Sequence, residues 1–82
     1  MPRFYFDVLD GDSFSCDDEG LQLESLNAAE GEAIRTAVQI GRDCLPKLLR
    51  PELCVRVRDE HGQPVLTVAV SMMVRRMDLA HA

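Results

Sequence analysis

Acidic side chains gather in the first part of the chain, and carboxylate oxygens are the ligands that hard cations prefer. These residues are Asp7, Asp10, Asp12, Asp17, Asp18 and Glu19. If the first hairpin brought them together, they would hold Mg2+ or Ca2+, and Mg2+ would support phosphodiester hydrolysis. Their spacing fits no calcium-binding loop, and turn chemistry accounts for several of them. We therefore assign no metal ligand and no cofactor, and a metal-dependent phosphoesterase is the third of three functional hypotheses.

The remaining reactive side chains lack the neighbours that catalysis requires. His61 lies in a polar turn and His81 lies close to the C-terminus, and neither has a nearby partner for acid–base work. Cys16, Cys44 and Cys54 are odd in number and form no C-x-x-C pair, which excludes a disulfide framework and a zinc cassette. We expect reduced thiols that pack as small apolar groups, no catalytic residue, and a cytoplasmic location.

Arginines end or line the last third of the chain, where they could converge on phosphates or on an acidic protein surface. They are Arg56, Arg58, Arg75 and Arg76. The formal charge of -5 disfavours binding to nucleic acid, and these segments carry no aromatic side chains for stacking on bases. Charges on a sheet edge that discourage aggregation explain the arginines as well. The second hypothesis is an antitoxin-like or regulatory protein that binds a toxin or RNA through this region.

The elements that position these residues belong to one small domain. The 82 residues are 46% hydrophobic and 28% charged, close to globular averages, so the chain should fold. The N-terminus has no apolar signal-peptide region, and the most apolar stretch, 65–74, is shorter than the roughly 20 residues of a membrane-spanning helix. We expect a single domain over residues 1–82, with 78–82 as a frayed tail and no membrane association.

A hairpin is predicted at the N-terminus. Phe4, Phe6 and Val8 alternate with polar residues, the period of a strand with one apolar face. The sequence Asp10-Gly11 predicts a type I′ turn. Residues 13–17 should return as the second strand, with Phe14 and Cys16 on one face, so that this hairpin contributes the largest side chains of the core.

One helix is predicted over residues 25–45, with Ser25 or Asn27 as its N-cap. Small residues recur every four positions on its apolar face, which suits close approach to a sheet. They are Ala29, Ala33, Ala37 and Gly41. Pro46 ends the helix, and a loop over 47–51 should cover Leu48 and Leu49.

A second hairpin is predicted from strands 52–58 and 65–75, joined by a polar turn. Alternate residues of both strands form apolar faces. The order strand, strand, helix, strand, strand predicts an α+β fold, ββαββ, with one helix on one face of a four-stranded antiparallel or mixed sheet. The first strand and the apolar fourth strand should be central, with the second and third at the edges.

The motifs taken together resemble a known family. The opening Met-Pro-Arg-x-Tyr-Phe-Asp, the Asp10-Gly11 turn, the Asp18-Glu19-Gly20 break, the alanine-rich helix and the hairpin that begins at Arg58 are similar to those of a family of short bacterial proteins known as a domain of unknown function. That resemblance implies no activity, ligand or catalytic residue. The architecture is also similar, more weakly, to that of HicB-type antitoxins.

The sheet face opposite the helix should be uncovered, and amphipathic patches of this kind are often covered by partners. Its residues, with the arginines beside them, form the predicted interaction surface: Tyr5, Leu9, Val65, Thr67, Ala69, Met73, Arg56 and Arg58. Small cores give little stability, and oligomerisation is one remedy. The leading hypothesis is a non-enzymatic interaction module that forms a homodimer through this face or through an edge strand.

Overall fold

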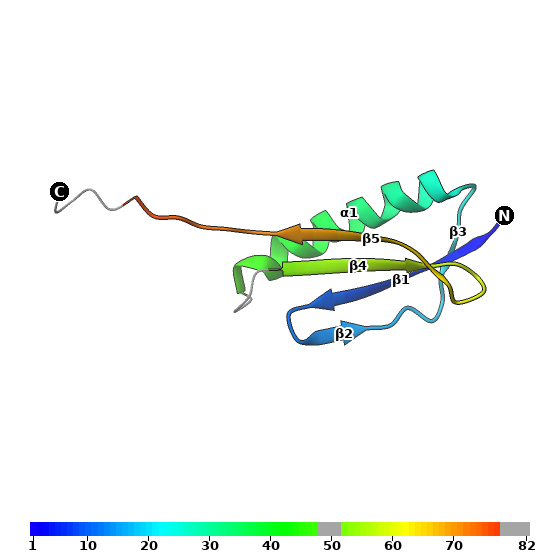
Figure 1. The fold of residues 1–82 in the computed structure, drawn as a ribbon, viewed down its shortest axis with the longest axis horizontal. Coiled ribbons are helices and arrows are strands. Elements are labelled where there is room, and N and C mark those ends of the chain that lie inside the picture. Colours follow the sequence, from blue (N-terminus) through cyan, green and yellow to red (C-terminus); the bar gives the residue numbers. More distant parts are fainter. Residues whose placement is uncertain (48–51, 78–82) are drawn as a thin grey trace.

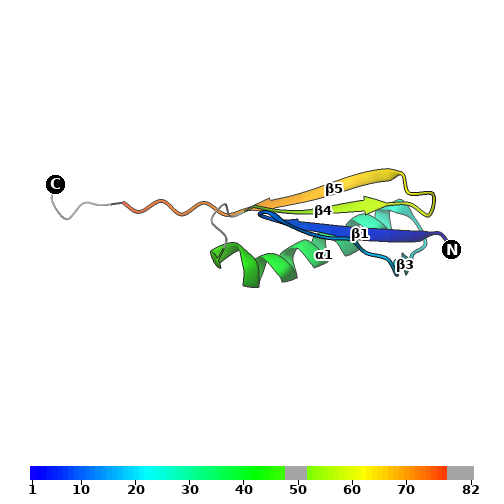
Figure 2. The same ribbon diagram turned by 90° about the horizontal axis from the view of Figure 1, so that it is seen from below.

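The computed structural model describes residues 1–47 and 52–77 of the chain. The strands are β1 (Arg3–Asp10), β2 (Ser13–Ser15), β3 (Leu21–Gln22), β4 (Glu52–Arg58) and β5 (Pro64–Ser71). Helix α1 (Leu26–Cys44) and a short 3-10 helix (Leu45–Lys47) lie between β3 and β4. Figures 1 and 2 show α1 along one face of the antiparallel sheet. The predicted α+β fold is confirmed.

The first hairpin forms where it was predicted, but its turn is of another type. Asp10 pairs with Ser13, so Gly11 and Asp12 are the central residues of the turn. Gly11 has a φ of 63°, and no residue other than glycine has positive φ in the described chain. Positive φ at the first central position alone is the pattern of a type II′ turn, which favours glycine there. The prediction of type I′ is wrong because Asp12 keeps negative φ.

The return strand of this hairpin is short and interrupted. β2 pairs with the end of β1, and β3 pairs with its beginning through Arg3 and Phe4. The predicted strand over 13–17 therefore ends at Ser15, and Phe14 is 56% exposed rather than part of the core. Phe14 pairs with Leu9, so its side chain lies on the sheet face that α1 does not cover and meets solvent.

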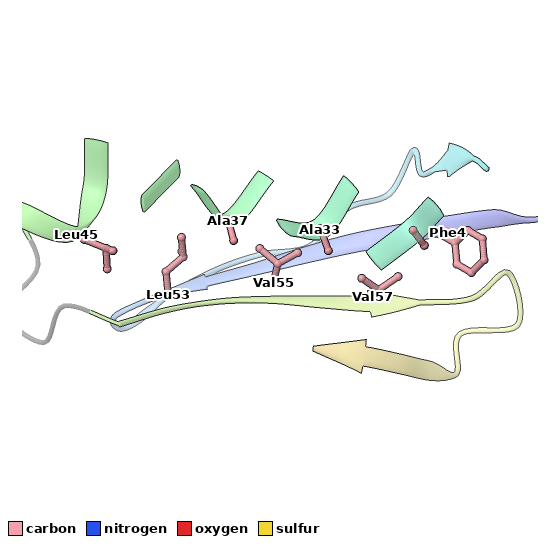
Figure 3. Close-up of a cluster of buried hydrophobic side chains, with 8 residues drawn as sticks. Phe4, Ala33, Ala37, Leu45, Leu53, Val55 and Val57 are labelled. Carbon is pink, nitrogen blue, oxygen red and sulfur yellow. The ribbon is translucent and has the colours of Figure 1, made fainter. Parts of the chain in front are cut away.

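Helix α1 agrees with its predicted bounds. Ser25 is the N-cap, and its Oγ accepts a hydrogen bond of 3.1 Å from the backbone N–H of Ala28. The small residues predicted to face the sheet are the buried residues of the helix: Ala29, Ala33, Ala37 and Gly41. Small side chains let α1 lie close to the β-layer, as Figure 3 shows for Ala33 and Ala37.

The core lies between α1 and the central strands. Leu53, Val55 and Val57 of β4 are fully buried, and Phe4 and Leu45 close the two ends of the cluster (Figure 3). The helix packs equally against β4 and β5 and only slightly against β1. Leu48 and Leu49, which we expected under the following loop, lie outside the described residues, as do the predicted tail and His81.

The strand order is β2-β1-β4-β5, with β3 beside β1. We predicted that the apolar segment 65–75 would be central and that 52–58 would be an edge, and this is wrong. β4 lies between β1 and β5 in the sheet and packs against α1. Its Leu53, Val55 and Val57 therefore have no exposed surface. The corresponding residues of β5 are only half-buried. The most apolar strand of the chain is therefore an edge strand.

Strand β5 also ends earlier than predicted. Its last residue is Ser71, which pairs with Glu52 at the start of β4. Residues 72–77 continue beyond the sheet without a strand beside them, and both ribbon views show them leading away from the domain (Figures 1 and 2). We call residues 72–77 the arm. Glu52 is the first residue of β4, so the pairing of β4 with β5 ends at Ser71.

Candidate functional site

One polar cluster lies on the sheet face that α1 leaves uncovered. Asp7 is 2% exposed, and both of its carboxylate oxygens accept hydrogen bonds from Arg58, over 2.7 Å from Nε and 3.1 Å from Nη2. Bidentate pairing of this kind fixes the guanidinium firmly. The hydrogen bonds from Arg58 hold the pKa of Asp7 below its usual value. The same interaction raises the pKa of Arg58.

Asp17 joins this cluster to the interrupted strand. Its Oδ2 accepts a hydrogen bond of 3.0 Å from the N–H of Phe6, and its Oδ1 accepts bonds of 3.1 Å from the N–H groups of Glu19 and Gly20. Burial raises the pKa of Asp17, but these backbone hydrogen bonds outweigh it, so the pKa is lowered. The backbone N–H of Asp17 donates to Oδ1 of Asp7 over 3.0 Å. Its backbone C=O accepts a hydrogen bond of 2.8 Å from Nη2 of Arg58.

The polar groups of this cluster form hydrogen bonds with one another, so the cluster stabilises the fold and leaves none of its charges free for a ligand. The guanidinium carbon of Arg58 lies 5.0 Å from the centre of the Tyr5 ring, a cation–π distance, and the Asp7 carboxylate is occupied by Arg58 and by the Asp17 backbone. No buried side-chain oxygen or nitrogen lacks a hydrogen-bond partner in the described part of the chain. The Arg58 charge that sequence analysis offered to a partner is thus already neutralised.

The acidic residues do not assemble into a metal site. Within residues 1–47 and 52–77, no group of three histidine, cysteine, aspartate or glutamate side chains is placed to hold a metal ion. Asp10 and Asp12 lie at the β1–β2 turn, whereas Asp17 lies where the edge strand is interrupted. Asp7 and Asp17 do lie together, but their carboxylates already accept hydrogen bonds from Arg58 and from backbone N–H groups.

The other reactive side chains lie apart from one another. Cys44 and Cys54 are half-buried, but Cys16 is exposed, so its predicted packing in the core is wrong. Its Sγ lies 3.7 Å from Nη2 of Arg58. His61 is an exposed turn residue whose Nε2 lies 4.0 Å from a carboxylate oxygen of Glu60. No helix in the described part of the chain is long and apolar enough to cross a membrane.

The predicted interaction surface is brought together only in part. The strand register places most of its residues on the uncovered face: Tyr5, Leu9, Arg56, Arg58, Thr67 and Ala69. Tyr5 and Leu9 are half-buried, whereas Arg56, Thr67 and Ala69 are exposed. Val65 packs against the edge of the core beside the irregular start of β5. Met73 lies in the arm beyond the sheet and is 81% exposed.

The two edges of the sheet differ in their protection. The N–H of Leu23 donates to Pro2 over 3.0 Å, and the side chain of Asp17 accepts from Phe6, so the edge of β1 away from β4 is occupied along its length. At the other edge, no described residue pairs with the outer side of β5. This strand contains no charged residue, and its only proline, Pro64, is its first residue.

The register shows which groups of β5 point outward. Backbone groups of successive strand residues face opposite sides. The N–H of Gly11 donates to the carbonyl of Glu52, the first residue of β4, and the N–H of Phe6 points the other way, to Asp17. The backbone groups of odd-numbered β1 residues therefore form hydrogen bonds with even-numbered residues of β4. Odd-numbered residues of β4 then bond to even-numbered residues of β5. The N–H and C=O groups of Thr67, Ala69 and Ser71 are consequently directed at the open edge.

An apolar groove of about 350 Å³ runs between this edge and the end of the helix. Val38, Gly41 and Leu45 line its helix side, and Val70 and Met72 line its strand side. Val38 is 49% exposed, and Ile34, one turn earlier, is 46% exposed. The open edge is therefore bordered by an apolar flank of α1. The sequence alone did not indicate this flank, because the apolar face of the helix was expected to lie against the sheet.

Residues 3–71 match the family described as Domain of unknown function (DUF6894). The chain belongs to this family. The DUF6894 match begins with β1 and ends with β5, so it includes the helix and the whole sheet and excludes the arm. No curated protein and no solved structure matches the chain. The expected resemblance to a family of unknown function is confirmed.

Proposed function

We propose that the protein is a non-enzymatic interaction module whose first partner is a second copy of itself, joined through the open edge of β5. The observation that carries this proposal is the contrast between the edges: one is formed by the short, interrupted strands β2 and β3, and the other is eight residues long, uncharged and apolar. Exposed edges of the latter kind pair with other strands unless charge, proline or a cover prevents it.

A two-fold axis normal to the sheet would join two β5 strands in antiparallel pairing. Such an axis keeps each residue on its own face of the sheet, so both helices lie over the same side. Helix α1 lies over β4 and β5 equally, so the two helix axes would be two strand spacings apart. Two spacings of about 4.8 Å give roughly 10 Å, at the upper end of the usual helix–helix distance of about 8–10 Å.

The side chains at this helix–helix contact are of the right kind. Ile34 and Val38 project from the flank of α1 that borders β5, and both are about half exposed in the single chain. In the pair, each apolar flank would face its own copy. Burial of apolar surface then adds to the hydrogen bonds formed by Thr67, Ala69 and Ser71.

The mass in solution tests the proposal. Light scattering should give twice 9.2 kDa at micromolar concentration. Val38→Glu should shift the protein toward the monomer, because it places a charge in the helix–helix contact. Gln39→Glu is the matched control: it adds the same charge at an exposed position one residue further along α1, and it should leave the mass unchanged. A wild-type monomer at high micromolar concentration would remove the proposal.

Hydrogen exchange gives a second test with an internal control. The N–H groups of Val68 and Val70 face β4 and should be protected at any concentration. Those of Thr67, Ala69 and Ser71 face the open edge, so their protection should rise with protein concentration if the edges pair. Exchange that stays fast for these residues in a dimer would assign the contact to another surface.

The uncovered face is the alternative surface for the same function. Arg56→Glu reverses an exposed charge at the centre of that face, far from α1. Dissociation by Arg56→Glu and not by Val38→Glu would place the contact there. The edge is the better supported surface because the polar cluster around Asp7 and Arg58 already occupies part of the face.

The antitoxin-like or regulatory alternative receives less support. It relied on Arg56 and Arg58 together, and Arg58 is bound to Asp7 and to the Asp17 carbonyl. A phosphoesterase would need carboxylates that are free to bind a cation, and those of Asp7 and Asp17 already accept hydrogen bonds from Arg58 and from backbone N–H groups. The cytoplasmic location expected from the sequence stays part of our proposal, and the free cysteines support it because thiols stay reduced in that compartment. The bacterial origin rests on the family resemblance alone.

A further inference from the structure

The arm is an apolar strand-like segment that has no strand beside it. Residues 72–77 leave the sheet directly after β5, and Met73, Val74 and Met77 are between 75% and 81% exposed. In the sequence, the two-residue period of β5 continues into the arm. Leu66, Val68 and Val70 face the helix side, and Met72 and Val74 occupy the next positions of that series.

We propose that the arm of each copy completes the sheet of the other copy by pairing along its β5 strand. This inference rests on the proposed self-association and adds the segment and register that form it. The occupant of the open edge is then a second copy of this chain, including the residues that lie outside the family match.

The apolar series sets the register. Its members on the helix side are Leu66, Val68, Val70, Met72 and Val74, and the series is centred on Val70. An axis at Val70 places Met72 of one copy opposite Val68 of the other, and Val74 opposite Leu66. Each apolar residue of the series then lies opposite an apolar residue of the second copy. No polar side chain is placed between them on the helix side of the joined sheet.

The groove supports the same axis. Val70 and Met72 line its strand side, and Val38 lines its helix side. With the axis at Val70, the second copy would bring its own Val70 and Met72 to the open side of the groove. The two grooves would then be continuous. Each would be filled by apolar side chains of the other copy, which are half-buried or exposed in the single chain.

The charges at the end of the arm meet acidic residues in this register. Arg75 and Arg76 would lie opposite Val65 and Pro64 of the second copy. The turn that follows β4 begins immediately beside Pro64 and carries Asp59 and Glu60. The arm would thus end with basic side chains next to an acidic turn, which favours this direction of pairing.

Two proline variants of the full chain test the arm. In an arm that pairs as an extension of β5, the N–H of Met73 would continue the outward-facing series of Thr67, Ala69 and Ser71 and donate to the second copy, whereas that of Val74 would face away. Both side chains are exposed in the single chain, so neither variant should unfold it. We expect Met73→Pro to weaken dimerisation about tenfold or more and Val74→Pro to weaken it much less.

The outcomes separate the arm from the dimer itself. A wild-type monomer in sedimentation equilibrium would overturn both proposals. A second outcome is a wild-type dimer that Met73→Pro and Val74→Pro leave equally strong and in which the N–H groups of Met73 and Arg75 exchange fast. That outcome would refute pairing by the arm and leave the pairing of β5 edges in place. Circular dichroism confirms that each variant keeps its fold.

Discussion

Asp17 takes the place of a missing strand partner for Phe6: its Oδ2 accepts the Phe6 N–H over 3.0 Å where the edge strand is interrupted. The same carboxylate binds the N–H groups of Glu19 and Gly20 through Oδ1. One side chain therefore satisfies the backbone of two segments and holds β2 and β3 in line along β1.

Loss of this carboxylate should destabilise the fold. Asp17→Ala leaves the Phe6, Glu19 and Gly20 N–H groups without their partner, and we expect the free energy of unfolding to fall by about 1–3 kcal/mol. Urea denaturation at fixed protein concentration measures this. Asp18→Ala is the control, since the Asp18 side chain is exposed and accepts no hydrogen bond within the described residues. Equal losses in the two variants would contradict the role of Asp17.

Stability should fall in acid. The pKa values of Asp7 and Asp17 are lowered from 3.8 in the folded chain. A carboxyl with a lowered pKa contributes stability that is full above its ordinary pKa and is lost as the pH falls through the lowered value. The free energy of unfolding, measured between about pH 5 and pH 2, should therefore decrease. Asp17→Asn should make the decrease shallower, and a profile parallel to the wild type would refute the assignment.

The bidentate geometry of Arg58 should matter beyond its charge. Arg58→Lys keeps the charge but cannot bind both oxygens of Asp7 and the Asp17 carbonyl at once, so the melting temperature should decrease. Arg56→Lys, a change of the same kind at the exposed neighbouring arginine, should have little effect. If the two variants melt alike, the pairing of Arg58 with Asp7 does not stabilise the fold.

Gly20 is required at the point where the interrupted edge turns back. Its φ is +74°, and an added Cβ would lie 2.9 Å from Cγ of Arg3 and 2.9 Å from Cε2 of Tyr5. Gly20→Ala should cost about 2 kcal/mol or more, since backbone strain and crowding add. Gly62→Ala is the matched control: its φ is +81° but nothing lies within 4 Å, so strain alone should cost about 1 kcal/mol. Similar losses at both positions would rule out the crowding.

The sequence predicts the helix well because its signals are local. Ser25 caps it, alanines and Gly41 mark its buried face, and Pro46 follows its end. Strand order depends on long-range pairing, and here apolar content was misleading. Residues 65–75 are the most apolar candidate strand, yet they cover most of the edge strand β5 and the first part of the arm, whereas β4, with two arginines, is central.

The candidate site was only partly predictable for a related reason. The sequence identified an uncovered face and allowed an edge strand, but residue types alone do not say which edge is closed. That information lies in Asp17, which the sequence suggested only as a turn residue or cation ligand. Its bond to Phe6 joins residues whose proximity depends on the irregular segment between β2 and β3.

The other edge of the sheet would also limit how many chains assemble. A sheet with two long, regular edges can add further copies at both of them and grow into fibres. Here that second edge consists of β2 and β3, which are three and two residues long and are interrupted between them. In a pair joined through β5, both remaining edges would be of this short kind, and the apolar strand that could promote fibre formation would lie inside the pair.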